Sequence, residues 1–124
     1  MYKLLIIDDE EDITDSLRSG LTKKGFEVHA YNDPEKALTE FKPNTFDLAL
    51  LDFKMPKING YDLFRELKKY DTKIKICFLS AHETPFLEFQ KIFPDLPHQC
   101  FIRKPITLNF LITHIESELN HSSN

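Results

Sequence analysis

An apolar run that ends in a carboxylate constrains the fold of this chain more than any other feature. Leu48 to Leu51 are apolar without alternation, and Asp52 follows at once. Strands of a parallel sheet that are buried on both faces have this continuous apolar character. Ligands of open α/β sheets bind beyond the carboxyl ends of the strands, so we expect Asp52 to lie at a ligand-binding edge.

Strand-like and helix-like segments alternate along the whole chain. The predicted strands are Lys3–Ile7, Phe26–Tyr31, Phe46–Asp52, Ile74–Leu79 and Cys100–Ile102. The sequence also predicts five helices. The first ends near Gly25, the second is capped by Asp33, and the third runs from about Tyr61 to Lys69. The fourth begins at Thr84, and the fifth is capped by Thr107. This alternation indicates a parallel sheet with right-handed crossovers. We therefore predict an α/β fold of three layers (α/β/α), a flavodoxin-like doubly wound five-stranded parallel sheet in the order 2-1-3-4-5 with five helices.

The composition fits one globular domain, because 41% of the 124 residues are hydrophobic and 29% are charged. We predict a domain over residues 1–120 and a polar tail over residues 121–124. The net charge of −4 argues against a nucleic-acid partner, since binding to a phosphate backbone needs clustered basic residues. Neither a signal peptide nor a transmembrane segment is recognisable, so we expect a cytoplasmic protein without a membrane partner.

The two cysteines, Cys77 and Cys100, each lie in an apolar run. They lack the CxxC or Cys/His spacing of redox and metal sites. This placement is typical of small buried thiols.

Carboxylates follow the first and third predicted strands, which are neighbours in the order 2-1-3-4-5. Asp8 and Asp9 follow the first strand, and Asp52 ends the third. Each alone suits a turn or a helix cap, but three like charges at one edge need a cation or displaced pKa values. Carboxylate oxygens with open positions for water suit Mg²⁺, and Mn²⁺ would also fit.

The fourth and fifth predicted strands are followed by groups that bind negative charge. Ser80 comes after the fourth strand, and Lys104 comes shortly after the fifth. Each alone could be a turn hydroxyl or a solvated surface lysine. Because both lie at carboxyl ends beside the same edge, we expect them to bind phosphoryl oxygens.

Taken together, these features resemble the receiver domain of two-component response regulators. The resemblance covers essentially the whole chain and rests on Asp8-Asp9, Asp52, the loop from Phe53 to Gly60, Ser80-Ala81 and Lys104-Pro105. It implies that Asp52 is a phosphoacceptor, which takes a phosphoryl group from a sensor histidine kinase or a histidine phosphotransfer protein.

The resemblance also implies which groups hold the metal and the phosphoryl group. Asp9, Asp52 and the backbone carbonyl of Lys54 would bind Mg²⁺, and Asp8 would act mainly through a bound water. Lys104 would pair with the phosphoryl group.

Other positions match residues that read out or tune phosphorylation in the family. Ser80 would swing toward the phosphoryl oxygens, and Phe101 would stand at the aromatic switch position, although plain core packing explains Phe101 equally well. Lys54 and His82, two residues beyond Asp52 and Ser80, match positions that tune the lifetime of the phosphoryl group.

The segment from Thr84 to Gln99 departs from the family pattern, because it carries Phe86, Phe89 and Phe93 where small residues are usual. It belongs to the usual signalling face, which comprises the fourth helix, the fifth strand and the fifth helix. We expect an exposed apolar strip there that docks a downstream protein or, on phosphorylation, a second copy of the chain.

The predicted function is a stand-alone phosphorylatable receiver that phosphorylates and dephosphorylates itself and is not a metabolic enzyme. One alternative is a phosphorylation-independent, receiver-like interaction module, which the departures between Thr84 and Gln99 would permit. A less favoured alternative is a Mg²⁺-dependent phosphohydrolase, which normally has a second acid near the nucleophile. Phe53 and Lys54 supply none.

Overall fold

The computed structural model describes residues 1–53, 55, 57–58, 60–80, 100–104 and 106–120. Its elements in chain order are β1 (Lys3–Ile7), α1 (Glu11–Lys23), β2 (Glu27–Tyr31), α2 (Pro34–Glu40), β3 (Leu48–Asp52), α3 (Gly60–Tyr70), β4 (Lys75–Ser80), β5 (Cys100–Arg103) and α5 (Leu108–Asn120). Four predictions from the sequence lie outside the described residues and stay predictions: the roles of Lys54 and His82, the helix from Thr84 with its apolar strip, and the tail at 121–124.

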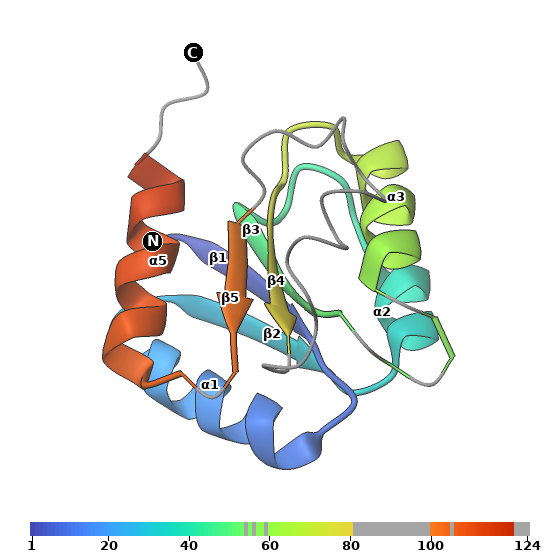
Figure 1. Cartoon of the computed structure of the whole chain (residues 1–124). Helices are drawn as coiled ribbons and strands as arrows, with labels where there is room; N and C mark the ends of the chain where they lie inside the picture. The colour runs from blue at the N-terminus through green and yellow to red at the C-terminus, as the bar shows by residue number, and fades with distance from the viewer. Residues whose placement is uncertain (54, 56, 59, 81–99, 105, 121–124) are drawn as a thin grey trace.

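The five strands form one parallel sheet in the order β2-β1-β3-β4-β5. Helices α1 and α5 lie on one side of this sheet, and α2 and α3 lie on the other (Figure 1). The predicted α/β class and strand order are therefore confirmed. No helix within the described ranges is long and apolar enough to cross a membrane.

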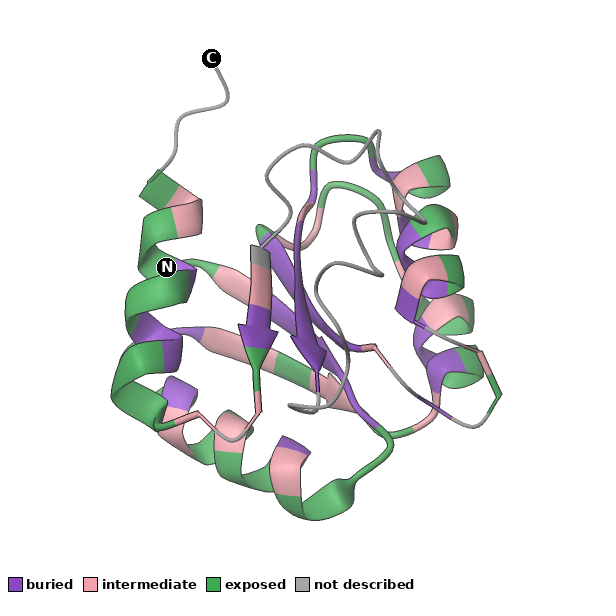
Figure 2. Cartoon of the chain, viewed as in Figure 1, coloured by how far each residue is buried: buried purple, intermediate pink, exposed green. Residues whose placement is uncertain are grey.

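The sheet divides the hydrophobic core into two clusters. Leu4 and Ile6 of β1 pack in the cluster under α1 and α5, whereas Leu5 and Ile7 pack in the cluster under α2 and α3. Every residue of β3 is buried, and the central strands form the purple interior in Figure 2. Because β3 is buried on both faces, it is well packed. It holds Asp52, its last residue, at the edge of the sheet.

Local sequence signals explain two of the helix boundaries. Helix α1 ends at Lys23, and Gly25 beyond it has a positive φ of 97°, a conformation that glycine adopts without steric cost. Helix α2 begins at Pro34 after Asp33, whose side chain accepts a hydrogen bond of 3.0 Å from the backbone N–H of Glu35. Both boundaries agree with the signals in the sequence.

Strand β3 begins at Leu48, two residues later than predicted. The Asp47 side chain accepts a hydrogen bond of 2.8 Å from the backbone N–H of Lys3, and its own N–H donates to the Lys3 carbonyl at 2.8 Å. Phe46 stacks on Phe41, with ring centroids 6.1 Å apart. Backbone bonding to β1 thus already begins at Asp47, and the regular strand begins one residue later at Leu48.

Cys77 is fully buried, as expected, but it is disulfide-bonded rather than a free thiol. In the backbone register of β4 and β5, the residue opposite Cys77 is Cys100, the other cysteine of the chain. The prediction of a buried free thiol is therefore wrong for Cys77, because the sequence does not reveal which positions of neighbouring strands lie opposite each other.

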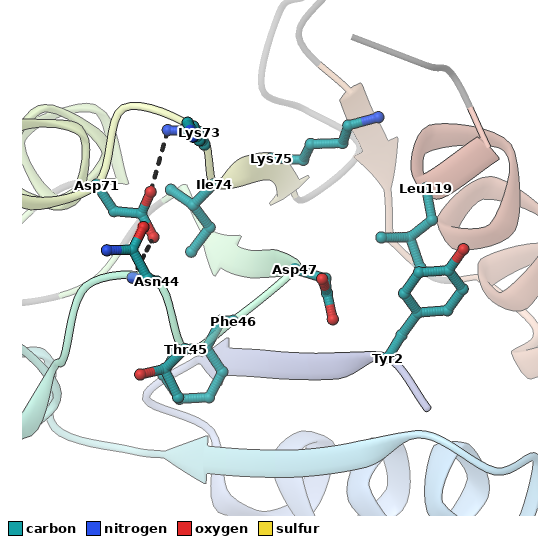
Figure 3. A pocket seen from close by; sticks show the side chains of 10 residues that line it. All are labelled: Tyr2, Asn44, Thr45, Phe46, Asp47, Asp71, Lys73, Ile74, Lys75 and Leu119. Carbon is teal, nitrogen blue, oxygen red and sulfur yellow. Dashed lines mark hydrogen bonds between the residues drawn. The ribbon is translucent and has the colours of Figure 1, made fainter.

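A cavity of about 300 Å³ lies at the opposite edge of the sheet from Asp52, beside the amino ends of β1, β3 and β4 (Figure 3). Its buried carboxylate, Asp71, accepts hydrogen bonds from the backbone N–H groups of Asn44 at 2.9 Å and Lys73 at 3.0 Å. Asn44 has a positive φ of 62°. Asp71 therefore ties together the loops that precede β3 and β4.

Candidate functional site

Three carboxylates meet where β1 and β3 end. One oxygen from each of Asp8, Asp9 and Asp52 can be chosen so that all three lie within 4.8 Å of one another. Asp8 is fully buried and Asp52 is 5% exposed, while Asp9 is exposed. The parallel pairing of β1 with β3 brings the acids together, because both strands end at the same edge.

Both oxygens of the Asp8 carboxylate are engaged. Oδ1 accepts a hydrogen bond of 2.9 Å from the backbone N–H of Glu10, and Oδ2 accepts one of 2.9 Å from Nζ of Lys104. The first bond forms an Asx turn between the strand and α1. This bond agrees with the turn or helix-cap role that the sequence allows for Asp8 alone, and it engages the backbone N–H of Glu10.

Lys104 connects the acids of two different strands. Its Nζ atom lies 2.9 Å from Asp8 Oδ2 and 3.3 Å from Asp52 Oδ1, and its side chain is 18% exposed. Its backbone N–H donates to the carbonyl of Ser80 at 2.6 Å, which anchors the start of the loop after β5. Burial by itself lowers the pKa of Lys104, but the hydrogen bond to Asp8 and the charges of both acids outweigh it, so the net pKa is raised.

The pKa of Asp52 is raised to about 7. Burial is the largest cause, the negative charge of Asp8 is the second, and a hydrogen bond with Asp9 adds to them, while Lys104 opposes the shift. The acidic neighbours of Asp52 disfavour its ionised form, and additional positive charge would stabilise that form.

The donor set of this cluster fits a divalent cation. Asp8, Asp9 and Asp52 offer only carboxylate oxygens, and the single ammonium of Lys104 leaves the group with excess negative charge. The exposure of Asp9 leaves the cluster open to solvent on one side. Mg²⁺ suits such a site because it prefers carboxylate oxygens and keeps several of its waters.

Ser80 and Phe101 lie on β4 and β5, the strands that follow β3 in the sheet. Ser80 is fully buried at the end of β4. Phe101 is half-buried, and its ring centroid lies 6.0 Å from that of Phe53 and 6.3 Å from that of Phe78. Phe53, which directly follows Asp52 and which sequence reasoning did not single out, thus connects Phe101 to the end of β3.

Comparison with known proteins places this geometry in a family. The family model described as the response regulator receiver domain matches residues 4–116. The regulatory protein VanRB of Enterococcus faecalis is 30% identical over 122 residues, which are 97% of this chain and 53% of VanRB. The transcriptional regulatory protein RprY of Bacteroides fragilis is 33% identical over 119 residues, which are 94% of this chain and 49% of RprY. The chain spans about half the length of these curated relatives, so stand-alone status stays a prediction.

Solved structures agree with this match. A response regulator receiver domain protein from Clostridium thermocellum superposes with a TM-score of 0.82 at 29% identity, over 97% of this chain and 95% of its own. A CheY-like receiver domain protein from Methanospirillum hungatei gives 0.85 at 26% identity, over 97% and 94%. Since the family match runs from β1 into α5, the chain belongs to the family of response regulator receiver domains.

Proposed function

We propose that the chain is a phosphoacceptor receiver that takes a phosphoryl group onto Asp52 from a phosphohistidine of a histidine kinase or a histidine phosphotransfer protein. The observation that carries this proposal is the position of Asp52 at the end of a fully buried strand, 3.3 Å from an ammonium and beside two further acids. The product would act as a signal, passed on by contact with another protein.

The chemistry that these residues support is a phosphoryl transfer between side chains. An ionised oxygen of Asp52 attacks the phosphorus, and the P–N bond of the phosphohistidine breaks. The electron pair of that bond returns to the ring nitrogen, and the ring leaves as neutral imidazole when its other nitrogen carries a proton. The product is an acyl phosphate on Asp52.

Lys104 supports this step in two ways. Its positive charge favours the ionised form of Asp52, which is the nucleophile. It also lies close enough to Asp52 to donate to an oxygen of the incoming phosphoryl group, where charge-assisted hydrogen bonds are strong. The Ser80 hydroxyl, at the neighbouring strand end, would donate to another phosphoryl oxygen.

We assign a Mg²⁺ site to Asp8, Asp9 and Asp52, with Mn²⁺ as a substitute and the Lys54 carbonyl as a further ligand. When bound, the cation supplies positive charge that offsets the acids and the phosphoryl oxygens. Asp9 and Asp52 would bind directly. Asp8 would act through water, since both of its oxygens already accept hydrogen bonds.

The signal would leave the site through Ser80 and the aromatic residues. Phosphorylation adds about −1.5 to −2 charges, which draws hydroxyl and ammonium donors toward the new oxygens. A shift of Ser80 alters the end of β4, and Phe101 packs against both Phe78 of β4 and Phe53 beside Asp52. Phe101 would therefore respond through packing, at a face that docks a downstream protein or a second copy.

Intact mass after incubation with acetyl phosphate and Mg²⁺ tests the proposal. We expect one phosphoryl adduct on the wild-type chain and none on Asp52→Asn. Asp47→Asn is the matched control, because Asp47 precedes the amino end of the same strand. It should accept the phosphoryl group normally.

Each other outcome would contradict the proposal in a specific way. If no adduct forms on any variant, a phosphorylation-independent interaction module is the better interpretation. Steady release of phosphate from unrelated esters would instead indicate a phosphohydrolase. An adduct that persists on Asp52→Asn would place the phosphoacceptor elsewhere.

A further inference from the structure

Two residues outside the acidic cluster hold the loop that carries Asp8 and Asp9. Asn32 directly follows β2, and its Nδ2 atom donates to the carbonyl of Asp8 at 2.9 Å and to Oγ1 of Thr14 at 2.8 Å. We infer that Asn32 and Thr14 are positioning residues that set the geometry of the metal-binding acids. This inference rests on the proposed function, because it concerns the same Mg²⁺ site.

The bond from Asn32 fixes the peptide unit that joins Asp8 to Asp9. The N–H of Asp8 bonds to the carbonyl of Tyr31 at 3.1 Å, at the end of the pairing between β1 and β2. Asn32, the next residue after Tyr31, uses its side chain to bind the Asp8 carbonyl. Because the peptide unit is planar, a fixed carbonyl fixes the direction in which the chain enters Asp9.

Thr14 fixes the other side of the loop. It is 2% exposed on α1, and its hydroxyl donates to the carbonyl of Glu11 at 3.0 Å while it accepts from Asn32. The N-cap residue of α1, Glu10, makes no side-chain capping bond. The contact between Asn32 and Thr14 therefore ties the first turns of α1 to the end of β2.

Asp9 lies between these two fixed points. It is exposed, so core packing does not hold its side chain, and the direction of its backbone decides where the carboxylate lies. An acid that is already aimed at the cation loses less conformational freedom when the cation binds. Removal of the support should therefore weaken metal binding even though neither Asn32 nor Thr14 is a metal ligand.

Calorimetric titration of Mg²⁺ into the full chain tests this inference. Substituting a residue that orients a metal ligand typically weakens metal affinity tenfold or more. We therefore expect about tenfold weaker Mg²⁺ binding for Thr14→Val and for Asn32→Ala. Thr14→Ser keeps the hydroxyl and should bind as the wild type does. Because both residues belong to one chain of hydrogen bonds, the double variant should lose no more affinity than Asn32→Ala alone.

Thr113→Val is the matched control. The hydroxyl of Thr113 donates to the carbonyl of Asn109 at 3.0 Å at an exposed position of α5, so the substitution removes a similar bond far along the chain from the acids. Its Mg²⁺ affinity should be unchanged. The unfolding free energy of every variant is measured in parallel without metal.

The outcomes separate this inference from the proposed function. If the wild-type chain does not bind Mg²⁺, the metal assignment in the proposed function fails. If the wild type binds but folded Thr14→Val and Asn32→Ala bind equally well, the positioning inference is wrong. A loss of unfolding free energy without a loss of affinity would also contradict the inference, since the contact would then support the fold alone.

Discussion

Nζ of Lys104 lies 3.3 Å from Oδ1 of Asp52, although the two residues are 52 positions apart in the chain. The same ammonium bonds to Asp8 at 2.9 Å. The ammonium group of Lys104 therefore joins the ends of β1 and β3 to the loop after β5. This arrangement makes Lys104 both a structural and a chemical part of the site.

Replacing Lys104 should reduce phosphorylation without abolishing the fold. Removing one preorganised donor to a reacting oxygen typically costs about 100-fold in rate, so we expect about that loss for Lys104→Met in the rate of adduct formation from acetyl phosphate. Lys69→Met is the control, because Lys69 is an exposed lysine of α3 paired with Glu66. Equal rates for Lys104→Met and wild type would contradict the role of the ammonium.

Asp52 should destabilise the metal-free fold at neutral and alkaline pH. Its pKa is raised from 3.8 to about 7 in the folded protein, so between about pH 4 and 7 the unfolded chain releases the proton while the folded protein retains it. The folded state therefore loses stability as the pH rises through this window, and the full penalty applies above it. Asp52→Asn removes the penalty.

Thermal unfolding in the presence of a chelator measures this effect. We expect the Tm of Asp52→Asn to exceed that of the wild type by roughly 5 °C at pH 8, with a difference that shrinks toward pH 4. Asp15→Asn, at an exposed acid paired with Arg18, should show no such trend. A difference that is constant with pH would mean that the ionisation of Asp52 is not its source.

Gly60 should be required for the position of the phosphoacceptor. A Cβ atom there would lie 2.9 Å from the carbonyl oxygen of Asp52 and 2.8 Å from Cα of Phe53, so backbone would have to move. We expect Gly60→Ala to slow adduct formation about tenfold and to lower the free energy of unfolding by about 1–3 kcal/mol.

Gly20→Ala is the control for this substitution. The three heavy atoms nearest to its new methyl group all belong to the flexible side chain of Leu108, which can move aside. Phosphorylation should then be unchanged. Normal adduct formation by Gly60→Ala would show that the loop after β3 accommodates the methyl group without moving Asp52.

Asp71 should matter for stability and not for chemistry. Asp71→Ala leaves the backbone N–H groups of Asn44 and Lys73 without their bonds, which should cost about 2 kcal/mol of unfolding free energy in denaturant titration. Lys73→Ala keeps the backbone N–H and should cost little. Since the cavity in Figure 3 lies at the opposite edge of the sheet, folded Asp71→Ala should form the phosphoryl adduct at the wild-type rate.

Much of the fold could be predicted because it follows from short-range patterns. Uninterrupted apolar runs marked the parallel strands, and Gly25, Asp33 and Pro34 marked helix ends through their backbone conformation and capping. The strand order followed from general rules for alternating strands and helices. The predicted third strand began too early, because the ring of Phe46 stacks on Phe41 and the regular strand starts only at Leu48.

The acids, the serine and the lysine at the strand ends could also be predicted, since parallel strands bring their carboxyl ends to one edge. The supporting contacts could not. The bonds from Asn32 to Asp8 and Thr14 join residues 24 and 18 positions apart, and nothing local marks them. The half-burial of Phe101 likewise depends on Phe53, a contact that only the folded chain creates.

The half-burial of Phe101 sets how firmly a switch at this position is held at rest. Full burial of a phenylalanine is worth about 1.5–3 kcal/mol, so moving this half-buried ring into solvent costs about 1 kcal/mol. A gap of that size leaves the outward position occupied in roughly one molecule in six. A receiver that moved Phe101 outward would therefore carry a measurable background output before any phosphoryl group arrives, and the packing of Phe53 and Phe78 around one ring would set its level.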